Sequence, residues 1–411
     1  MDIPIVVVTY NRPQSLKRLL LSLSNANYQP NRSIDLIISI DYSDDISCAI
    51  VARQFNWEFG KKTILEHKHR LGLKEHIIRC GDISLDHDGI LLLEDDLIVS
   101  PSFYNFAIAA SQYYIHNDYI AGISLYGYER NEFCDMPFSP IPDGSDIYFM
   151  KVPSSWGEVF LRKHWNDFKK SYIAGIVLDQ SDFLPNLVIN NWSEASWKKL
   201  YFKHMITNNL FFVYPMHSYS SNMGEIGSHY FSDSSFLKTK LSLKKENFIF
   251  NDFESTINIY DQFMEWEPSS VKCDQSGLPW DDIEIDLYGY KPLKYIKKSK
   301  VVTSRIVTVT LGHIDVSMHP VQLNVYFNNI NSTGDLFTFN IANVKDVVDD
   351  SFSIRKYFNR CICPNLRLFS FREGIESVKK SFIYKTGYLI LWPAKIIFNL
   401  FSSINRKLKT K

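Results

Sequence analysis

The first 115 residues alternate between short apolar runs and segments of helical periodicity, and this pattern constrains the fold more than any other feature. Residues 3–8, 34–40 and 90–93 are nearly continuous apolar runs. Between the first two runs, residues 13–24 carry leucines three and four positions apart, which is typical of an amphipathic helix. Strands that are apolar throughout are buried on both faces. The sequence therefore predicts an α/β fold with a mostly parallel sheet and helices on both faces.

Polar side chains follow these runs at the points where the predicted strands end. Arg12 follows the first run, Asp41 follows the second, and the acidic triplet Glu94, Asp95 and Asp96 follows the third. In open α/β sheets, ligands bind beyond the carboxyl ends of the strands. Adjacent carboxylates suit a hard cation such as Mg²⁺ or Mn²⁺, which often takes only one or two protein carboxylates and completes its coordination with phosphate oxygens. The triplet therefore predicts a metal site beside a nucleoside diphosphate.

The remaining chain changes character twice. Residues 116–235 are rich in aromatic residues and loops, which favours a sugar-binding wall, although an aromatic core explains any single ring equally well. Residues 301–344 alternate like antiparallel strands. The predicted organisation has four parts: a catalytic domain (1–235, with a nucleotide-binding half 1–115 and an acceptor half 116–235), its extension (236–300), a small β-rich unit (301–350) and a basic amphipathic helical tail (351–411).

Composition excludes some classes of protein and partner. The 45 basic and 45 acidic side chains cancel, so no net field attracts nucleic acid. The six cysteines are scattered, which favours free thiols in a reducing compartment. No basic segment precedes the first strand, and no stretch reaches the roughly 18–20 apolar residues of a membrane span. We expect a cytoplasmic protein. The basic, aromatic tail leaves two alternatives open: a peripheral position at the inner face of a membrane, or a helix docked on the protein.

Three segments resemble the GT-A glycosyltransferases, which have a Rossmann-like fold. "IPIVVVTYNRPQSLKRLL" is similar to their first strand and helix, "IISIDYSDD" to their second strand, and "ILLLEDDLIVSPSFYNF" to their metal motif. The resemblance covers about residues 1–235 and is nearest to the branch of the β-1,2-N-acetylglucosaminyltransferases and related bacterial enzymes. It implies metal-dependent, inverting transfer of a sugar from a nucleotide sugar, with UDP favoured, to a glycan or a lipid-linked glycan.

The resemblance also implies roles for individual residues. Those assigned to the nucleotide and its diphosphate are Val8, Thr9, Arg12, Asp41 (on the base), Lys74, Glu94 and Asp95 (on the ribose). Asp96 is assigned to the Mn²⁺ or Mg²⁺ ion, together with His229, which belongs to a loop that closes over the diphosphate. Simpler structural readings stay open, because Asp41 and Asp95 could cap helices and a lone histidine is often structural.

One position departs from the family. Inverting enzymes of this fold use a carboxylate to deprotonate the acceptor, and in this branch an Asp follows a Trp on an acceptor-side helix. Here Lys198 stands at that place, which leaves Glu158, Glu194 and Glu225 as candidate catalytic bases. Lys198 also keeps open a catalytically silent protein that only binds sugar or nucleotide. A sugar-1-phosphate nucleotidyltransferase is a weaker alternative, because "TYNRPQS" lacks the glycine-rich loop that cradles a triphosphate.

Overall fold

The computed structural model describes residues 1–30, 32–179, 182–225, 237–245, 247–268, 277–327 and 337–349. The chain divides into two compact units, 1–353 and 354–411, and the description below concerns the first. The predicted helical tail, Cys361, Cys363 and His229 lie outside the described residues. Cys48 and Cys80 are buried free thiols, as the sequence predicts.

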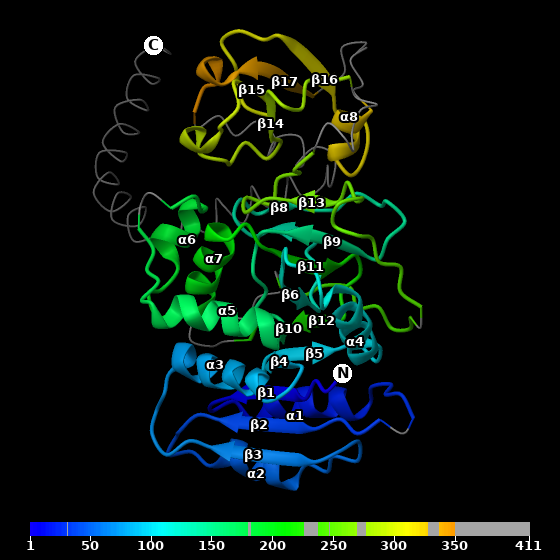
Figure 1. The fold of residues 1–411 in the computed structure, drawn as a ribbon, viewed down its shortest axis with the longest axis vertical. Helices are drawn as coiled ribbons and strands as arrows, with labels where there is room; N and C mark the ends of the chain where they lie inside the picture. Colours follow the sequence, from blue (N-terminus) through cyan, green and yellow to red (C-terminus); the bar gives the residue numbers. More distant parts are fainter. Residues whose placement is uncertain are drawn as a thin grey trace, which may run out of the picture. The chain divides into compact units, whose positions relative to one another are not determined.

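A nine-stranded mixed sheet forms the centre of the fold, in the order β13-β9-β11-β6-β10-β4-β1-β2-β3 (Figure 1). Its first half is parallel throughout, and it confirms the predicted alternation of strands and helices. The elements of this half are β1 (Ile5–Thr9), α1 (Pro13–Ser24), β2 (Leu36–Ile40), α2 (Ser47–Gln54), β3 (Lys62–Glu66), α3 (Leu73–Asp82), η1 (Ile83–Leu85) and β4 (Gly89–Glu94).

The second half of the sheet is mixed. Strand β10 lies between β4 and β6 and is antiparallel to both, so it joins the two halves. The elements are β5 (Leu97–Val99), α4 (Phe103–Tyr114), β6 (Ile120–Ser124), β7 (Arg130–Asn131), β8 (Met136–Pro137), β9 (Ile147–Met150), β10 (Glu158–Leu161), α5 (Arg162–Ile173), α6 (Asn186–Asn191), α7 (Trp197–Thr207), β11 (Phe211–Pro215), β12 (Ser220–Asn222) and β13 (Ile259–Tyr260).

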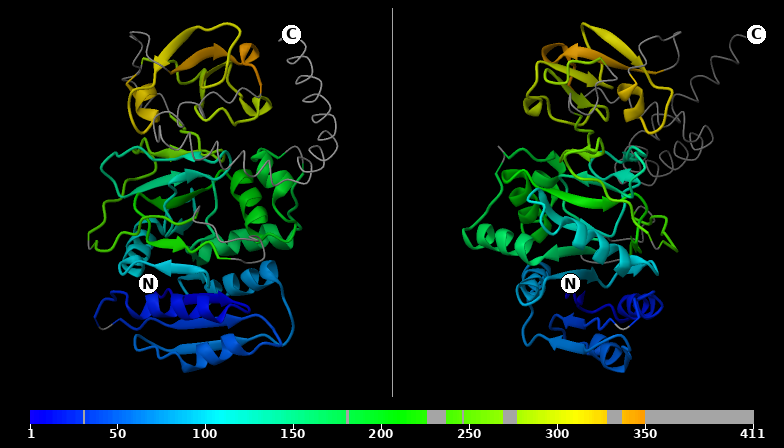
Figure 2. Two further views of the ribbon diagram at one scale, coloured as in Figure 1. Left: turned by 180° about the vertical axis from the view of Figure 1, so that it is seen from behind. Right: turned by 45° about the vertical axis from the view of Figure 1, so that its right-hand side comes forward.

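Apolar side chains explain why helices cover both faces of this sheet (Figures 1 and 2). All five residues of β1 are buried. On one face, Leu16, Leu19 and Leu20 of α1 join a core with residues of α2 and α4. On the other face α3, α5 and α7 pack together, with Trp165 fully buried. Each fully buried leucine stabilises the fold by roughly 1.5–3 kcal/mol relative to exposure.

A second sheet follows in the order β14-β15-β17-β16. It is formed by β14 (Ile283–Asp286), β15 (Lys300–Thr303), β16 (Gly312–Asp315) and β17 (Thr338–Asn343), accompanied by η3 (Leu293–Tyr295), α8 (Gln322–Tyr326) and η4 (Val344–Asp346). The sheet thus takes up the region predicted to be β-rich and begins earlier, at β14. Lys291 connects it to the chain after β13, because its Nζ forms ion pairs with Asp261 at 2.6 Å and with Glu284 at 2.9 Å.

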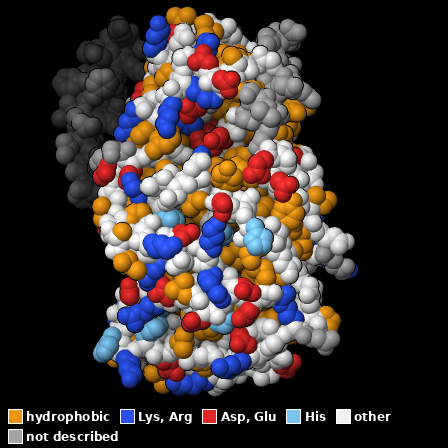
Figure 3. Space-filling view, viewed as in Figure 1, with side chains coloured by type: hydrophobic (Ala, Val, Ile, Leu, Met, Phe, Trp, Pro, Cys, Tyr) orange, Lys and Arg blue, Asp and Glu red, His pale blue; other side chains and the backbone are white. Residues whose placement is uncertain are grey.

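The surface agrees with the balanced charge of the sequence. On the face drawn in Figure 3, basic and acidic side chains are interspersed. Within the part of the chain that the structure describes, no helix has the length and apolar character that crossing a membrane requires.

Candidate active site

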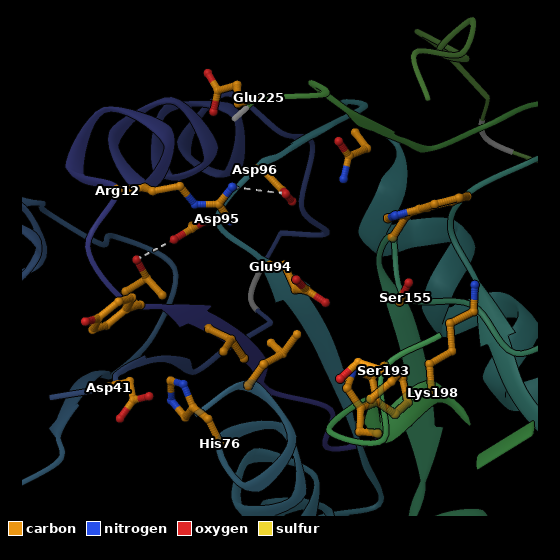
Figure 4. A pocket seen from close by; sticks show the side chains of 18 of the residues that line it. Arg12, Asp41, His76, Glu94, Asp95, Asp96, Ser155, Ser193, Lys198 and Glu225 are labelled. Atoms are coloured by element: carbon orange, nitrogen blue, oxygen red, sulfur yellow. Dashed lines mark hydrogen bonds and ion pairs between the residues drawn. The ribbon is translucent and has the colours of Figure 1, made fainter. Parts of the chain in front are cut away.

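A cavity of about 780 Å³ opens at the carboxyl ends of β1, β2 and β4 (Figure 4). Its volume is within the usual range of small-molecule sites. One wall comes from residues before 100 and the other from residues after 130. The lining residues are Val8, Thr9, Tyr10, Asn11, Arg12, Asp41, Arg70, Leu73, His76, Glu94, Asp95, Asp96, Glu132, Ser155, Trp156, Leu187, Asn191, Trp192, Ser193, Ser196, Trp197, Lys198, Asn222, Glu225 and Leu237.

Strand register explains why the predicted nucleotide residues meet here. Val8 is paired with Glu94 across β1 and β4, and the Asp95 amide donates to the Val8 carbonyl at 3.1 Å. On the other side, the Asp41 amide donates to the Thr9 carbonyl at 3.0 Å. The residues that follow β1, β2 and β4 are therefore level with one another at one edge of the sheet.

Arg12 lies between the last two acids of the triplet. Its guanidinium forms an ion pair with Asp95 and a second with Asp96, in which Nη1 lies 3.3 Å from Oδ2. Asp95 is also fixed by the Thr9 hydroxyl, which donates to Oδ2 at 2.7 Å. Among the described residues, the buried Oδ1 of Asp96 has no hydrogen-bond partner. An unpartnered carboxylate oxygen at this place is suited to a cation.

The triplet carries more negative charge than Arg12 balances. Burial, followed by the charges of Asp96 and Asp95, raises the pKa of Glu94 to about 8. Burial raises the pKa of Asp95 to about 6, although Arg12 and the Thr9 hydroxyl act in the opposite direction. A divalent cation would relieve this excess, so the residues fit a Mg²⁺ or Mn²⁺ ion. No cluster of three or more His, Cys, Asp or Glu side chains in the described ranges could hold a metal. Ligand oxygens would therefore have to complete its coordination.

Asp41 lies at the edge of the cavity with every acceptor position in use. Its Oδ1 accepts from the amides of Tyr42 and Leu71, each at 2.8 Å. Its Oδ2 accepts from the Gly72 amide at 3.0 Å and forms an ion pair with Arg70. A carboxylate offers about four lone-pair positions. Asp41 therefore braces the turn before α3, and its predicted contact with a nucleotide base would require one of these partners to leave.

This bracing leads to a prediction for Asp41→Ala. Leu71 and Gly72 would lose their acceptor for two partly buried amides, so we expect the free energy of unfolding to fall by about 1–3 kcal/mol. UDP affinity should fall as well, because the turn lines the cavity. Urea unfolding and calorimetric titration with UDP measure the two effects. A variant that loses UDP affinity at unchanged stability would contradict the bracing role.

One cavity residue on this wall, Arg70, was not predicted from the sequence. The Arg70 guanidinium lies 3.5 Å from the centre of the Tyr10 ring, over its face. A stacked pair of this kind presents flat surfaces that suit a nucleotide base. Arg70 follows β3, so the rule that ligands bind beyond strand ends could have found it.

Three predicted residues are not brought to the cavity. Lys74 Nζ lies 3.5 Å from the backbone carbonyl of Glu194. The Glu194 side chain is 85% exposed and pairs with Lys199 at 2.5 Å. Glu158 is fully buried within β10, and neither carboxylate oxygen has a hydrogen-bond partner among the described residues. Burial raises the pKa of Glu158 well above its usual value. Since the side chain has no exposed surface, it is also out of reach of a substrate.

Glu225 does line the cavity, but its carboxylate is committed elsewhere. Arg18 binds it through two hydrogen bonds, at 2.5 and 2.9 Å, and the Ser15 hydroxyl donates to it at 2.5 Å. The hydrogen bond from Arg18 is the largest of the effects that lower the pKa of Glu225 to about 2. So weak a proton acceptor does not suit the role of catalytic base.

The wall opposite Arg12 contains one further carboxylate, Glu132, which follows β7. Lys198 of α7 lies between two indoles, with Nζ 4.8 Å from the ring centre of Trp192 and 5.1 Å from that of Trp156. The same Nζ lies 3.4 Å from Oε1 of Glu132. Figure 4 shows Lys198 across the cavity from Arg12 and Asp96. Sequence reasoning missed Glu132, because no strand end or motif distinguishes it in the sequence.

His76 lines the cavity, and its buried imidazole is difficult to protonate. Its Nε2 lies 2.7 Å from the Ser39 hydroxyl, and burial, followed by nearby positive charge, lowers its pKa to about 3. An unfolded chain takes up this proton near pH 6.5. Since the unfolded state binds more protons between these values, stability should fall as the pH drops from 6.5 towards 3, by up to about 1.4 kcal/mol per pH unit.

Urea unfolding at pH 7, 5.5 and 4.5 measures this dependence. His76→Gln should flatten it, while the exposed His116→Gln should leave it unchanged. An equally steep loss of stability in His76→Gln would show that other groups cause it.

Comparison with known proteins gives likeness in fold. No protein-family model matches the chain, and no curated protein matches its sequence. The glycosyltransferase TarS of S. aureus, as the fragment 1–349 in complex with UDP-GlcNAc, is similar over 56% of this chain and 60% of its own, with 15% identity and a TM-score of 0.38. The mannosyltransferase PcManGT of Pyrobaculum calidifontis, in complex with GDP-Man and Mn²⁺, is similar over 39% and 45%, with 11% identity and a TM-score of 0.29.

A cytidylyltransferase of Leptospira borgpetersenii is similar over 43% of this chain and 66% of its own, with 10% identity and a TM-score of 0.28. Of the TarS fragment described above, this chain covers less than two thirds of the length. Glycosyltransferases are among the similar structures, but the branch of the β-1,2-N-acetylglucosaminyltransferases is not shown. At these TM-scores the likeness does not decide function, which has to be inferred from the residues of the cavity.

Proposed function

We propose that the chain is a metal-dependent glycosyltransferase that transfers a hexosyl or N-acetylhexosaminyl group from a UDP-sugar to a glycan or a lipid-linked glycan, with inversion. One observation carries the proposal: Arg12 joins Asp95 and Asp96 at the carboxyl end of the sheet, and the buried Oδ1 of Asp96 has no partner among the described residues. This is an arrangement for a cation and a diphosphate, and it lies in a cavity large enough for a nucleotide sugar.

The wall formed by β1, β2 and β4 would hold the donor. Asp96 would hold a Mn²⁺ or Mg²⁺ ion, which, when bound, neutralises the charge that develops on the departing diphosphate. The guanidinium of Arg12 uses two of its nitrogens on Asp95 and Asp96, so its remaining N–H group can donate to a phosphate oxygen. Tyr10 and Arg70 offer flat surfaces for the base. UDP is the nucleotide that the resemblance favours.

The opposite wall would hold the acceptor. Trp156 and Trp192 line it, and aromatic faces stack on the CH groups of sugar rings. The basic tail, which lies outside the described residues, extends the proposal to a lipid-linked acceptor at the inner face of a membrane. Sedimentation with anionic vesicles tests this extension, and equal pelleting of the full chain and of a 1–378 truncation would remove it.

The decisive experiment measures UDP release from a panel of UDP-sugars, with Mn²⁺, with Mg²⁺ and with EDTA. We expect one donor to be turned over only when a divalent ion is present, with water or an extract of cell-surface glycan as acceptor. Failure of every donor with both ions would reject the proposal.

A catalytically silent binding protein is the second candidate. The observation in its favour is Lys198, a cation at the position where the resembling family carries its catalytic acid. Metal-dependent binding of UDP in calorimetry, without turnover of any donor, would favour this alternative.

A further inference from the structure

The proposed transfer needs a group that takes the proton from the acceptor, and none of the three sequence candidates is suited to it. Glu158 has no access to the cavity, Glu194 points into solvent, and Glu225 is bound by Arg18 and Ser15. The six carboxylates that line the cavity belong to Asp41, Glu94, Asp95, Asp96, Glu132 and Glu225. The choice therefore lies among the lining carboxylates whose oxygens are not already taken.

Most of these carboxylates either bind another side chain or backbone group, or lie on the wall opposite Lys198. All acceptor positions of Asp41 are used by the turn before α3. Asp95 and Asp96 are paired with Arg12. Glu94 ends β4 and points into the space between the two walls, where the charge of Lys198 acts on it as well as that of Arg12 (Figure 4). Glu94 is therefore the competing candidate, and comparison of Glu94→Gln with Glu132→Gln separates the two. Glu132 alone of the six follows β7 in the acceptor half and pairs with α7.

The geometry of Glu132 suits a proton acceptor. Lys198 fixes Oε1 at 3.4 Å, and Lys198 is itself held between Trp156 and Trp192. Oε2 has no hydrogen bond to any described residue and is not among the buried oxygens without partners. The Glu132 side chain is 12% exposed. One oxygen is thus oriented by a cation while the other stays accessible, on a wall whose two indoles could bind a sugar acceptor.

We infer that Glu132 is the general base of the transfer, an inference that rests on the proposed function. Oε2 of Glu132 takes the proton of the attacking hydroxyl as its oxygen forms a bond to the anomeric carbon. The bond from that carbon to the diphosphate oxygen breaks, and its electron pair leaves with the UDP. The products are the new glycoside, UDP and a protonated Glu132, which returns its proton to solvent. Lys198, in this assignment, is a positioning residue that orients Oε1.

The test uses the donor that wild-type protein turns over fastest, with water as the acceptor, because attack by water needs the same proton acceptor. Glu132→Gln should lower the rate of UDP release by about 10²–10⁴-fold, the usual range for a lost general base. The affinity for UDP with Mn²⁺ should stay within about threefold of wild type, since Glu132 lies on the acceptor wall. Glu129→Gln, an exposed carboxylate three residues earlier, is the matched control and should keep full activity.

A second variant separates a catalytic role from a structural one. Glu132→Ala leaves space for a small carboxylate, so formate should restore part of the lost rate in this variant and leave Glu129→Gln unaffected. A Glu132→Gln protein that releases UDP within about threefold of the wild-type rate would overturn the inference. The inference would equally fall if UDP affinity dropped in parallel with the rate, if formate restored nothing, or if Glu94→Gln alone lost turnover at unchanged UDP affinity. Absence of turnover in the wild-type protein would instead overturn the proposed function itself.

Discussion

Asp96→Ala should abolish most of the turnover of UDP-sugars while the protein stays folded. We expect a fall of about 10³-fold in UDP release, because a bound cation supplies several kcal/mol of charge stabilisation and each 1.4 kcal/mol is worth a factor of ten. The Mn²⁺ dependence of UDP affinity should disappear with it. The fold should survive, because the only ion pair of Asp96 with a described residue is the 3.3 Å contact with Arg12.

The control for this prediction is Asp86→Ala, which removes an exposed carboxylate from the turn before β4. It should keep both turnover and the Mn²⁺ dependence of UDP binding. Steady-state UDP release and calorimetric titration with and without Mn²⁺ measure the two effects. Full activity in Asp96→Ala would contradict the assignment of the metal to this side chain.

The second large effect is expected on stability, at Lys291. Its side chain is 3% exposed, and its ammonium forms ion pairs with Asp261 and Glu284. Although burial acts in the opposite direction, these two carboxylates raise the pKa of Lys291 above its usual value. Lys291→Met would leave two carboxylates uncompensated at a largely buried place. The free energy of unfolding should therefore fall by about 3–5 kcal/mol, a large part of the 5–15 kcal/mol typical of a domain.

Lys300→Met provides the matched comparison. Lys300 also pairs with an aspartate, Asp282, at 2.9 Å, but both side chains are at least one-third exposed. A surface pair of this kind contributes about 0–1 kcal/mol, so its loss should hardly shift the urea midpoint. Equal losses of stability in the two variants would show that the buried position of Lys291 has no special importance.

The wall formed by β1, β2 and β4 could be predicted because it depends on adjacency along the chain and on one rule of sheet topology. Strands β1, β2 and β4 are consecutive or neighbouring parallel strands, so the residues after each of them meet at one edge. This rule alone was enough to predict that Arg12, Asp95 and Asp96 lie close together. That both carboxylate oxygens of Asp41 are fully hydrogen-bonded could not be foreseen, because these bonds depend on the conformation of the turn at 70–72. Gly72 has a φ of 77° there, which favours glycine.

The opposite wall depends on packing between segments that are distant in sequence. Glu132 and Lys198 are 66 residues apart, and only the packed positions of β7 and α7 bring them within 3.4 Å. Glu158 carried a signal that could have been used. It lies two residues before Phe160 in β10, so both side chains lie on the same face of the strand, and α5 and α7 cover that face. Its burial is a consequence of strand periodicity.

The central position of β10 has a consequence for how this protein is made. During translation β4 leaves the ribosome with one side paired to β1, and its other partner, β10, is complete only at Leu161. Until then the nascent chain presents a strand that is apolar up to Leu93, with unpaired amides and carbonyls that other chains can join. From Glu94 to Leu161, synthesis takes about 3–13 s at 5–20 residues per second. During this interval a chaperone that covers the open edge of β4 should raise the yield of native protein.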